Sequence, residues 1–249
     1  FYGFMSYAND WVKTGHRVIG QIAEQYVSEK TKKNIDYLLD GMSLAYVSTY
    51  ADEIKSDKKF THLDSWHYVN LNPDESYFNS KKNPNGDIFF AISKCIEVLR
   101  DNNFSKSDKS FYLKLLVHFI GDLHQPLHVG KKEDRGGNDI KLYWFEELTN
   151  LHALWDTELI EFFKMSYSEL AENLTTNHNY QETFFDDGDI YLWMLESQKI
   201  VKDIYANTKP NSKLGYEYHY KYFHIASNQL KIAGKRLAMV LNNIFDSED

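Results

Sequence analysis

Three histidines and one aspartate lie close together in LLVHFIGDLHQPLHVG, residues 115–130. His118 and Asp122 are four residues apart, so a helix places them one turn apart on the same face. At about 100° per residue, His124 lies about 200° around the helix from Asp122 and points elsewhere. His128 follows a proline and can fold back toward the first pair, although helix geometry does not require it. Such residues can bind a metal ion, but one His–Asp pair can equally be a solvated or hydrogen-bonded surface pair.

The same spacing recurs at His152 and Asp156 in LHALWDTEL. Asp52, in YADEIK, lies on an otherwise apolar face, where a carboxylate is costly unless it pairs or binds a cation. Three further histidines occur in the N-terminal part of the chain, namely His16, His62 and His67. Nitrogen and oxygen ligands without thiolates suit Zn²⁺ in a catalytic rather than a structural site. Because these residues exceed what one tetrahedral ion needs, they predict a multinuclear hydrolytic site.

Helical periodicity predicts the elements that must position these side chains. Ser43 can cap a helix, Gly41 ends another, and Pro126 stops the helix that carries His118. Helices are expected over residues 16–27, 29–39, 43–54, 87–100, 109–124, 189–205 and 227–245. A Gly-Gly-Asn sequence followed by alternating residues predicts a turn and a short β-hairpin near 136–147. The expected fold class is therefore mainly α, with a single helical domain and no linker.

Composition narrows the classes of function. The formal net charge is −8, the wrong sign for a nucleic-acid-binding module that acts through a basic patch. It does not argue against an enzyme whose bound cations supply the positive field. No apolar run is long enough to predict a membrane span. The single cysteine, Cys95, excludes an internal disulfide and is expected to be a core residue.

The first ten residues, FYGFMSYAND, are apolar and contain Ser6-Tyr7-Ala8, a small-x-small pattern. They resemble the end of an export signal, and the alternative is an ordinary N-terminal arm. We therefore expect residues 1–10 to be separate from a catalytic domain over 11–249. An export signal would direct the protein to the periplasm or the outside of the cell.

Several motifs, taken in order along the chain, resemble one family. They are W-x-x-x-G-H at 11–16, A-D-E at 51–53, H-x-x-x-D-x-x-Q-P-L-H at 118–128, G-G-N at 136–138 and N-L-H-x-x-W-D at 150–156. Together they resemble the zinc-dependent single-strand-specific nucleases of the S1/P1 type, which share a superfamily and a helical fold with zinc-dependent phospholipase C. The closing Q-L-x-x-A-G-x-R-L-A sequence also fits. Each motif alone is weak, but the ordered set is specific.

The resemblance implies a site of three Zn²⁺ ions. The first would be held by Asp52, His67, His118 and Asp122. Asp122 would bridge to the second ion, which would also take His16 and the backbone amino and carbonyl groups of Trp11. The third would be held by His128, His152 and Asp156. His62 and His124 have no place in this scheme, and direction had already excluded His124.

The activity implied is endonucleolytic hydrolysis of single-stranded DNA and RNA to 5′-phosphorylated products, with 3′-nucleotidase activity on mononucleotides. In-line attack would come from a water shared by two zinc ions, which Asp52 orients, while the third ion stabilises the leaving oxygen. Lys55 matches a position that contacts phosphate, although it can equally be a solvated lysine. Tyr68 matches an aromatic platform for a base. Asn70 stands where the family often has an aspartate that binds the base, so this departure affects base preference.

A second departure concerns Trp11, whose family counterpart is the mature N-terminus with a free amine. Processing at Trp11 would satisfy the metal chemistry, whereas cleavage after Ala8 would satisfy the small-x-small pattern. We expect a free Trp11 amine in the active form. The rival activity is that of a phospholipase C-like phosphodiesterase, which typically has Glu at the position of Asp156. A protein that only stores metal with the same ligands is the rival outside enzymes.

Overall fold

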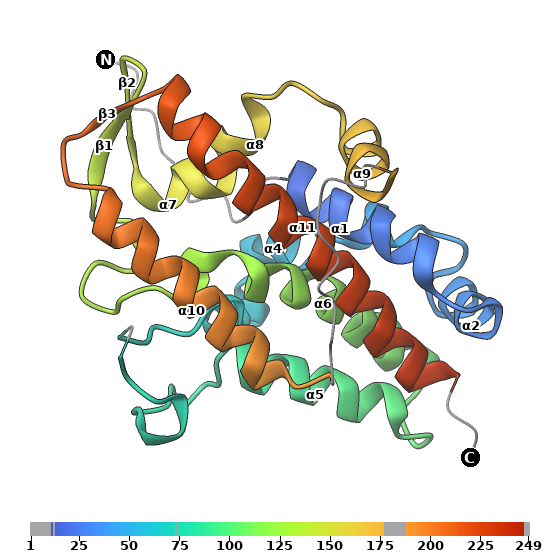
Figure 1. Ribbon diagram of the computed structural model, residues 1–249. Coiled ribbons are helices and arrows are strands. Elements are labelled where there is room, and N and C mark those ends of the chain that lie inside the picture. Colours follow the sequence, from blue (N-terminus) through green and yellow to red (C-terminus); the bar gives the residue numbers. More distant parts are fainter. Residues whose placement is uncertain (1–10, 12, 73, 177–187, 247–249) are drawn as a thin grey trace.

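The computed structural model describes residues 11, 13–72, 74–176 and 188–246 of the chain. Long helices dominate it (Figure 1): α1 (Lys13–Tyr26), α2 (Glu29–Leu39), α5 (Ile88–Arg100), α6 (Lys106–His124), α9 (Tyr167–Thr176), α10 (Ile190–Asn207) and α11 (Tyr216–Phe245). Short helical segments connect them: α3 (Leu44–Val47), α4 (Tyr50–Glu53), η1 (Ile54–Ser56), η2 (Lys58–His67), η3 (Tyr77–Asn79), η4 (Pro126–Val129), α7 (Leu151–Ala153), the π-helical η5 (Leu154–Glu158) and α8 (Leu159–Glu161). The predicted mainly α fold is confirmed.

Helix α6 forms the centre of the structure, with α5, α10 and α11 packed around it (Figure 1). Its start is fixed by a capping box, in which Ser105 and Asp108 each accept a hydrogen bond from the other's backbone N–H. From residue 115 to residue 124 every side of the helix is buried. A helix buried all round normally carries apolar residues. The polar side chains of His118, Asp122 and His124 must therefore find partners inside the protein.

The longest helix, α11, runs diagonally across the molecule beside α1 (Figure 1). The two backbones can approach closely because Gly234 has no side chain at their crossing. A Cβ atom at that position would lie 2.6 Å from the Cβ of Ile22. This contact holds α1, and with it His16, against the central helices.

Three short strands form the only sheet that the described residues contain: β1 (Lys141–Trp144), β2 (Glu147–Asn150) and β3 (Lys213–Leu214), in the order β2-β1-β3. β1 pairs antiparallel with β2 and parallel with β3. The predicted hairpin is present, but its strands span 141–150, and the Gly-Gly-Asn sequence at 136–138 lies in the turn before them. The sequence did not predict β3, the helix α9 or the 3-10 helix η2. It also missed the first part of α11, which begins at Tyr216 rather than at residue 227.

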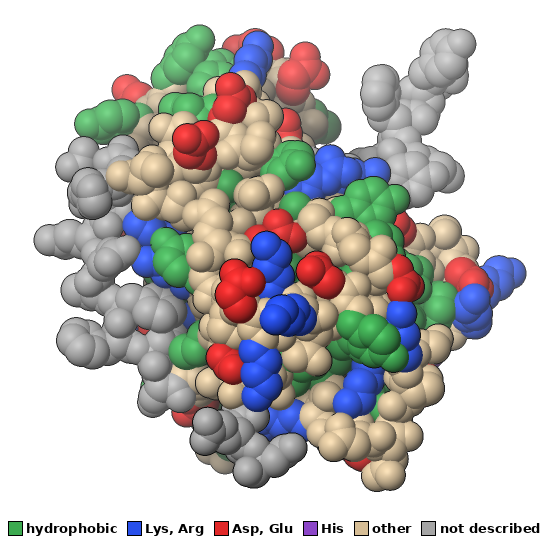
Figure 2. All heavy atoms as spheres, turned by 90° about the vertical axis from the view of Figure 1, so that its right-hand side faces the viewer, with side chains coloured by type: hydrophobic (Ala, Val, Ile, Leu, Met, Phe, Trp, Pro, Cys, Tyr) green, Lys and Arg blue, Asp and Glu red, His purple; other side chains and the backbone are tan. Residues whose placement is uncertain are grey.

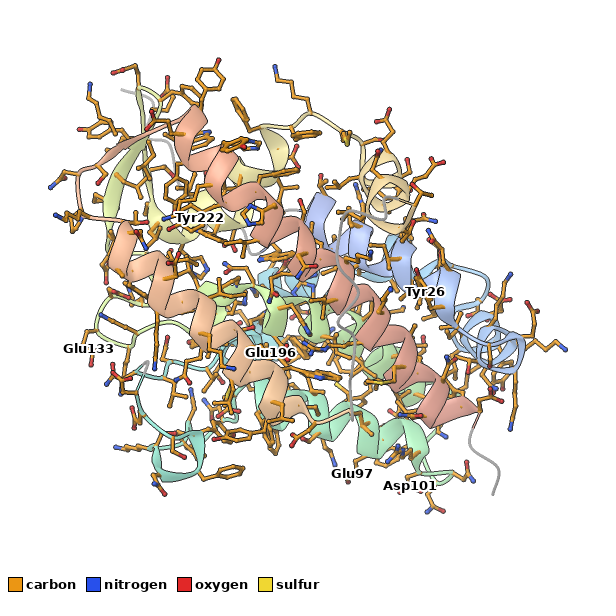
Figure 3. All side chains as sticks on the ribbon, viewed as in Figure 1. Tyr26, Glu97, Asp101, Glu133, Glu196 and Tyr222 are labelled. Carbon is orange, nitrogen blue, oxygen red and sulfur yellow. The ribbon has the colours of Figure 1, made fainter. Side chains whose placement is uncertain are left out.

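The main core surrounds α6 and includes the buried Cys95, as expected. A smaller apolar cluster fills the space between the sheet, the α7–α8 segment, α10 and α11, with Trp155 and Tyr222 among its members. Tyr222 is labelled on α11 in Figure 3. Among the described residues, no helix is both long enough and apolar enough to cross a membrane. The expectation for residues 1–10 lies outside the described part of the chain.

Candidate metal centre

The predicted ligand side chains come from seven helical segments and meet around the C-terminal half of α6. Three groups of residues have ligand atoms within 4.8 Å of one another: His16, Asp52 and His118; His67, His118 and Asp122; and His128, His152 and Asp156. All eight side chains with ligand atoms named in the sequence prediction belong to these groups. Residues separated by as many as 140 positions, His16 and Asp156, thus contribute to one region of the structure.

The carboxylate of Asp122 lies at the centre of this region. Its Oδ2 atom is 2.9 Å from His67 Nδ1 and 3.1 Å from His118 Nε2. Its Oδ1 atom is 3.4 Å from His16 Nε2 and 3.5 Å from His128 Nδ1. One carboxylate with each oxygen facing a different set of imidazoles has the geometry of a bridge between two cations.

Gly121 allows the imidazole of His16 to reach this carboxylate. A Cβ atom on Gly121 would lie 2.8 Å from His16 Nδ1, which is closer than such contacts allow. Without it, the His16 ring stacks on the His118 ring with 3.9 Å between centroids. A side chain at residue 121 would therefore push α1 and His16 away from α6.

Backbone carbonyl groups orient three of the imidazoles. The Nδ1 atoms of His118, His128 and His152 lie 2.7–2.8 Å from the carbonyl oxygens of Ser48, His67 and Gly136, respectively. A carbonyl oxygen only accepts, so each Nδ1 carries a proton, and Nε2 is the ring nitrogen left to bind a ligand once it carries no proton. This arrangement is typical of metal-binding histidines, whose second ring nitrogen donates to a carbonyl or carboxylate.

The electrostatics of the group favour positive charge between the carboxylates. Burial by itself would lower the pKa of His118, but the carboxylates of Asp122 and Asp52 outweigh it and raise the pKa to about 9. Burial would raise the pKa of Asp122, whereas the neighbouring His118 and His128 hold it well below its usual range. Burial lowers the pKa of His16 and of His67, which keeps these imidazoles neutral and able to act as ligands.

His128, His152 and Asp156 form the group farthest along the chain. His152 Nε2 lies 3.1 Å from Asp156 Oδ2, and the His128 and His152 rings stack with 5.2 Å between centroids. Asp156 lies within the π-helical segment η5 and is fully buried. The fold-back of His128, which helix geometry alone left open, is therefore present.

Asp52 and Lys55 lie at the rim of the site. The Asp52 side chain is 28% exposed, and its Oδ1 atom lies 3.5 Å from His118 Nε2 and 2.8 Å from Lys55 Nζ. Lys55 thus pairs with the same Asp52 oxygen that faces the imidazoles of His67 and His118. Both side chains therefore form ionic contacts at the site.

A hollow of about 240 Å³ opens beside the third group and is lined by Tyr68, Asn70, Asn138, His128 and His152, among others. Tyr68 is 38% exposed, and its side chain lines this hollow. The structure therefore places both predicted base-contacting residues next to the ligand cluster.

His62 and His124 lie away from the cluster, as predicted. His62 is exposed, and its Nδ1 lies 3.0 Å from the Lys59 carbonyl oxygen. His124 is buried, and its Nε2 accepts a hydrogen bond of 2.9 Å from Arg236, which also pairs with Glu196 at 2.7 Å. Glu196 is labelled on α10 in Figure 3. His124 thus links α6 to α11 and α10 rather than binding metal.

Buried polar atoms in the group lack hydrogen-bond partners, which is expected of metal ligands. Among the described residues, His16 Nδ1 and Nε2, Asp122 Oδ1 and Asp156 Oδ2 have none. Such atoms are costly in a folded protein unless a cation takes the place of a hydrogen bond. The donor set of imidazole and carboxylate without thiolate is one that suits Zn²⁺.

The comparison with known families decides what kind of protein has this site. The family model described as S1/P1 Nuclease matches residues 11–246. The chain belongs to the S1/P1 nuclease family. This S1/P1 nuclease is therefore a hydrolase of phosphodiester bonds in nucleic acids, and the predicted resemblance is confirmed.

Individual relatives agree with this assignment. The S1/P1 nuclease is 31% identical to Endonuclease 4 of Arabidopsis thaliana over 280 residues, which covers 96% of this chain and 90% of the relative. It is 31% identical to Nuclease S1 of Aspergillus oryzae over 166 residues, covering 64% of this chain and 57% of the relative. Among solved structures, the fold is similar to that of Clostridium perfringens alpha-toxin, with a TM-score of 0.50, 16% identity, and coverage of 97% of this chain and 66% of that chain.

Gln125 belongs to the H-x-x-x-D-x-x-Q-P-L-H motif, but no role was predicted for it from the sequence. The buried Gln125 donates a hydrogen bond from its side-chain nitrogen to Asp156 Oδ1, and its side-chain oxygen accepts one of 2.6 Å from the Leu127 N–H. It therefore fixes both a ligand and the turn that returns His128 to the site. Its position between Asp122 and His128 in the motif was the available signal.

Proposed function

We propose that this nuclease cuts single-stranded DNA and RNA endonucleolytically, leaves 5′-phosphorylated products, and removes 3′-phosphate from mononucleotides. The observation that supports this most directly is the carboxylate of Asp122, with imidazoles 2.9–3.5 Å from its two oxygens. The hollow beside it, lined by Tyr68 and Asn70, is an open site for a base. A phosphodiester bound between the two would have its base on one side and the ligand cluster on the other.

Three Zn²⁺ ions would occupy the site in this proposal. Asp52, His67, His118 and Asp122 would hold the first, His16 and the backbone of Trp11 would hold the second together with Asp122, and His128, His152 and Asp156 would hold the third. When bound, zinc would activate a water for attack on phosphorus and neutralise charge on the phosphoryl oxygens.

The rim residues would position the reacting groups. The Asp52 carboxylate, partly exposed and 2.8 Å from Lys55, would accept a hydrogen bond from the attacking water and orient it for in-line attack. The Lys55 ammonium would lie near the phosphate oxygens and favour the negative charge that develops there. Both side chains are partly exposed, so they would be accessible to substrate.

Tyr68 would select unpaired bases. Stacking on its ring accepts any base, but a base must leave the duplex to reach it. Asn70, which is exposed at the same hollow, offers both a donor and an acceptor to the edge of a base. The pair would therefore give a strong preference for single strands and little preference for sequence.

The proposal includes a catalytic domain over 11–249 and secretion or periplasmic export with processing that frees the Trp11 amine. The Trp11 side chain is fully buried and packs against Gly15, the residue before His16. N-terminal sequencing of active, exported protein should begin at Trp11. An active enzyme that retains Asn9-Asp10 would refute this part.

Gln125→Leu should weaken binding of the third zinc by about 10–100-fold, the usual effect of removing a hydrogen bond that orients a metal ligand. The replacement keeps a similar volume but leaves Asp156 Oδ1 without its amide donor. Zinc titration of the purified variant measures the effect. Gln198→Leu is the matched control, because it removes a buried amide hydrogen bond to the Asn72 carbonyl and touches no ligand. Equal zinc affinities in the two variants would contradict the role of Gln125.

The decisive assay compares substrates. We expect acid-soluble 5′-nucleotides from denatured DNA and from RNA, slow release from duplex DNA, and phosphate release from 3′-mononucleotides. Lecithin serves as the competing substrate. Release of choline phosphate without nucleotide release would replace the proposal by a phospholipase C-like activity. Bound zinc without hydrolysis of any phosphoester would indicate a metal-storing protein.

A further inference from the structure

A second hollow, of about 300 Å³, adjoins the one beside the metal cluster and shares Tyr68 and Asn70 with it. Its other walls come from the loop over residues 80–84, from Asp87 at the start of α5, and from Lys132 just after η4. None of the predicted metal ligands lines this second hollow. We call it the lysine groove, because three of its lining residues are Lys81, Lys82 and Lys132.

The lysine groove has positive charge to offer a ligand. Lys81 and Lys132 are exposed, and neither forms an ion pair with a carboxylate of the described residues. Lys82 is partly engaged, since its ammonium donates to the Tyr77 carbonyl and to Ser80 Oγ. The groove thus contains two exposed ammonium groups that form no ion pair with the described residues.

One carboxylate also lines the groove, but its oxygens are already used. Asp87 is buried, and it accepts hydrogen bonds of 3.1 Å from the Tyr77 hydroxyl and from the backbone N–H groups of Phe89 and Phe90. Its negative charge therefore lies at the N-terminus of α5, where the helix dipole stabilises it. The other charged side chains that line the groove are its three lysines.

Residues 68–71 separate the two hollows and are held in place by three backbone hydrogen bonds. The Val69 N–H donates to the His128 carbonyl at 2.8 Å, the Leu71 N–H donates to the Gly130 carbonyl at 3.0 Å, and the Ile88 N–H donates to the Tyr68 carbonyl at 3.2 Å. These bonds join residues 68–71 to η4, which carries His128, to Gly130 shortly before Lys132, and to the start of α5. The groove and the metal cluster therefore keep a fixed relation to each other.

The face on the right-hand side of Figure 1 has charges of both signs mixed together. On the face shown in Figure 2, blue Lys and Arg side chains alternate with red Asp and Glu side chains over the described residues. The net charge of the protein is −8, so two lysines without an ion pair beside the substrate site are a local exception to its negative charge. Such an exception next to a catalytic site raises the local concentration of an anionic substrate.

We propose that the lysine groove binds the phosphate backbone of the nucleotide adjoining the one at the metal cluster, which makes the enzyme prefer oligonucleotides to dinucleotides. The proposal rests on the proposed nuclease function and specifies the length of substrate that its site takes. Because ammonium groups bind phosphate as point charges, the contact depends on salt and not on sequence. A strand passing over Tyr68 would place successive nucleotides in the two hollows.

The test uses the Lys81→Gln/Lys132→Gln double variant and measures kcat/KM for a single-stranded oligonucleotide and for a dinucleotide. Each phosphate contact on a single strand makes the logarithm of the binding constant fall by about 0.7 for each unit of log salt concentration. If the variant lacks two such contacts, raising salt from about 50 to about 200 mM should lower kcat/KM on the oligonucleotide about sevenfold more for the parent enzyme than for the variant. The variant should therefore lower the ratio of the two kcat/KM values, oligonucleotide over dinucleotide, about sevenfold more at the lower salt than at the higher salt. Binding of a phosphorothioate-linked oligonucleotide, followed by fluorescence anisotropy, should weaken in parallel.

The matched control is Lys32→Gln/Lys33→Gln on α2, which removes two exposed lysines from a helix at the right of Figure 1, away from the groove. It should keep the parent's substrate ratio and salt dependence. If the groove variant behaves like this control in both kinetics and anisotropy, the inference is overturned. Lysine-dependent binding without hydrolysis would overturn the proposed nuclease chemistry and leave the groove assignment standing.

Discussion

Asp122→Asn should lower kcat/KM on a single-stranded oligonucleotide by about 10²–10³-fold, the scale of losing a main electrostatic stabiliser of the transition state. Each oxygen of Asp122 faces different imidazoles, at 2.9–3.1 Å for Oδ2 and 3.4–3.5 Å for Oδ1. An amide has nearly the same shape, but it carries no charge and presents one oxygen instead of two. It therefore cannot bridge two cations, and the zinc content of the purified variant should fall below that of the parent.

The control for this variant is Asp64→Asn, which changes an exposed aspartate on η2 that lies outside all three ligand groups. Its activity and zinc content should match the parent's. Circular dichroism establishes that Asp122→Asn remains folded, so that lost activity reports on the site. Full zinc content with activity within about tenfold of the parent's would show that Asp122 is not the bridge, since a tenfold change corresponds to only about 1.4 kcal/mol.

Most of the long helices were predictable because they depend on local periodicity and on turn residues, but α9 and the 3-10 helix η2 were not predicted. His118 and Asp122 face the same way for the same reason, since their spacing alone sets the direction. The start of α6 was placed slightly late, because Ser105 with Asp108 forms the cap, upstream of the expected start at residue 109. The first part of α11 was missed because its tyrosines are indifferent helix formers. Its helical state reflects tertiary packing, such as that of Tyr222 against Trp155 at 5.5 Å between ring centroids.

The parts of the site that depend on long-range contacts could not be read from the sequence. The hydrogen bond from Gln125 to Asp156 joins residues 31 positions apart, and no local pattern indicates it. The return of His128 to the cluster depends on the turn that Gln125 caps and on the carbonyl of His67, 61 residues away. The lysine groove likewise appears only when Lys132 and the loop over 80–84 are brought together by the fold.

Removal of zinc with a chelator should abolish hydrolysis and lower Tm by about 10 °C. The physical reason is that Asp122, Asp156 and His16 are fully buried, or nearly so, and have polar atoms without hydrogen-bond partners. A cation bound there stabilises the folded state by about 4 kcal/mol when its concentration is about a thousandfold above its Kd. For a protein of this size, each kcal/mol corresponds to about 2–4 °C in Tm.

Differential scanning calorimetry and the oligonucleotide assay, performed on the same chelated sample, check both parts of this prediction. Zn²⁺ added back should restore Tm and activity together, whereas Mg²⁺, which prefers oxygen ligands, should restore neither. Chelated protein that keeps its Tm and its activity would contradict a zinc site at this cluster. Loss of activity with an unchanged Tm would instead mean that the buried imidazoles and carboxylates satisfy one another, and that zinc contributes to chemistry but not to folding.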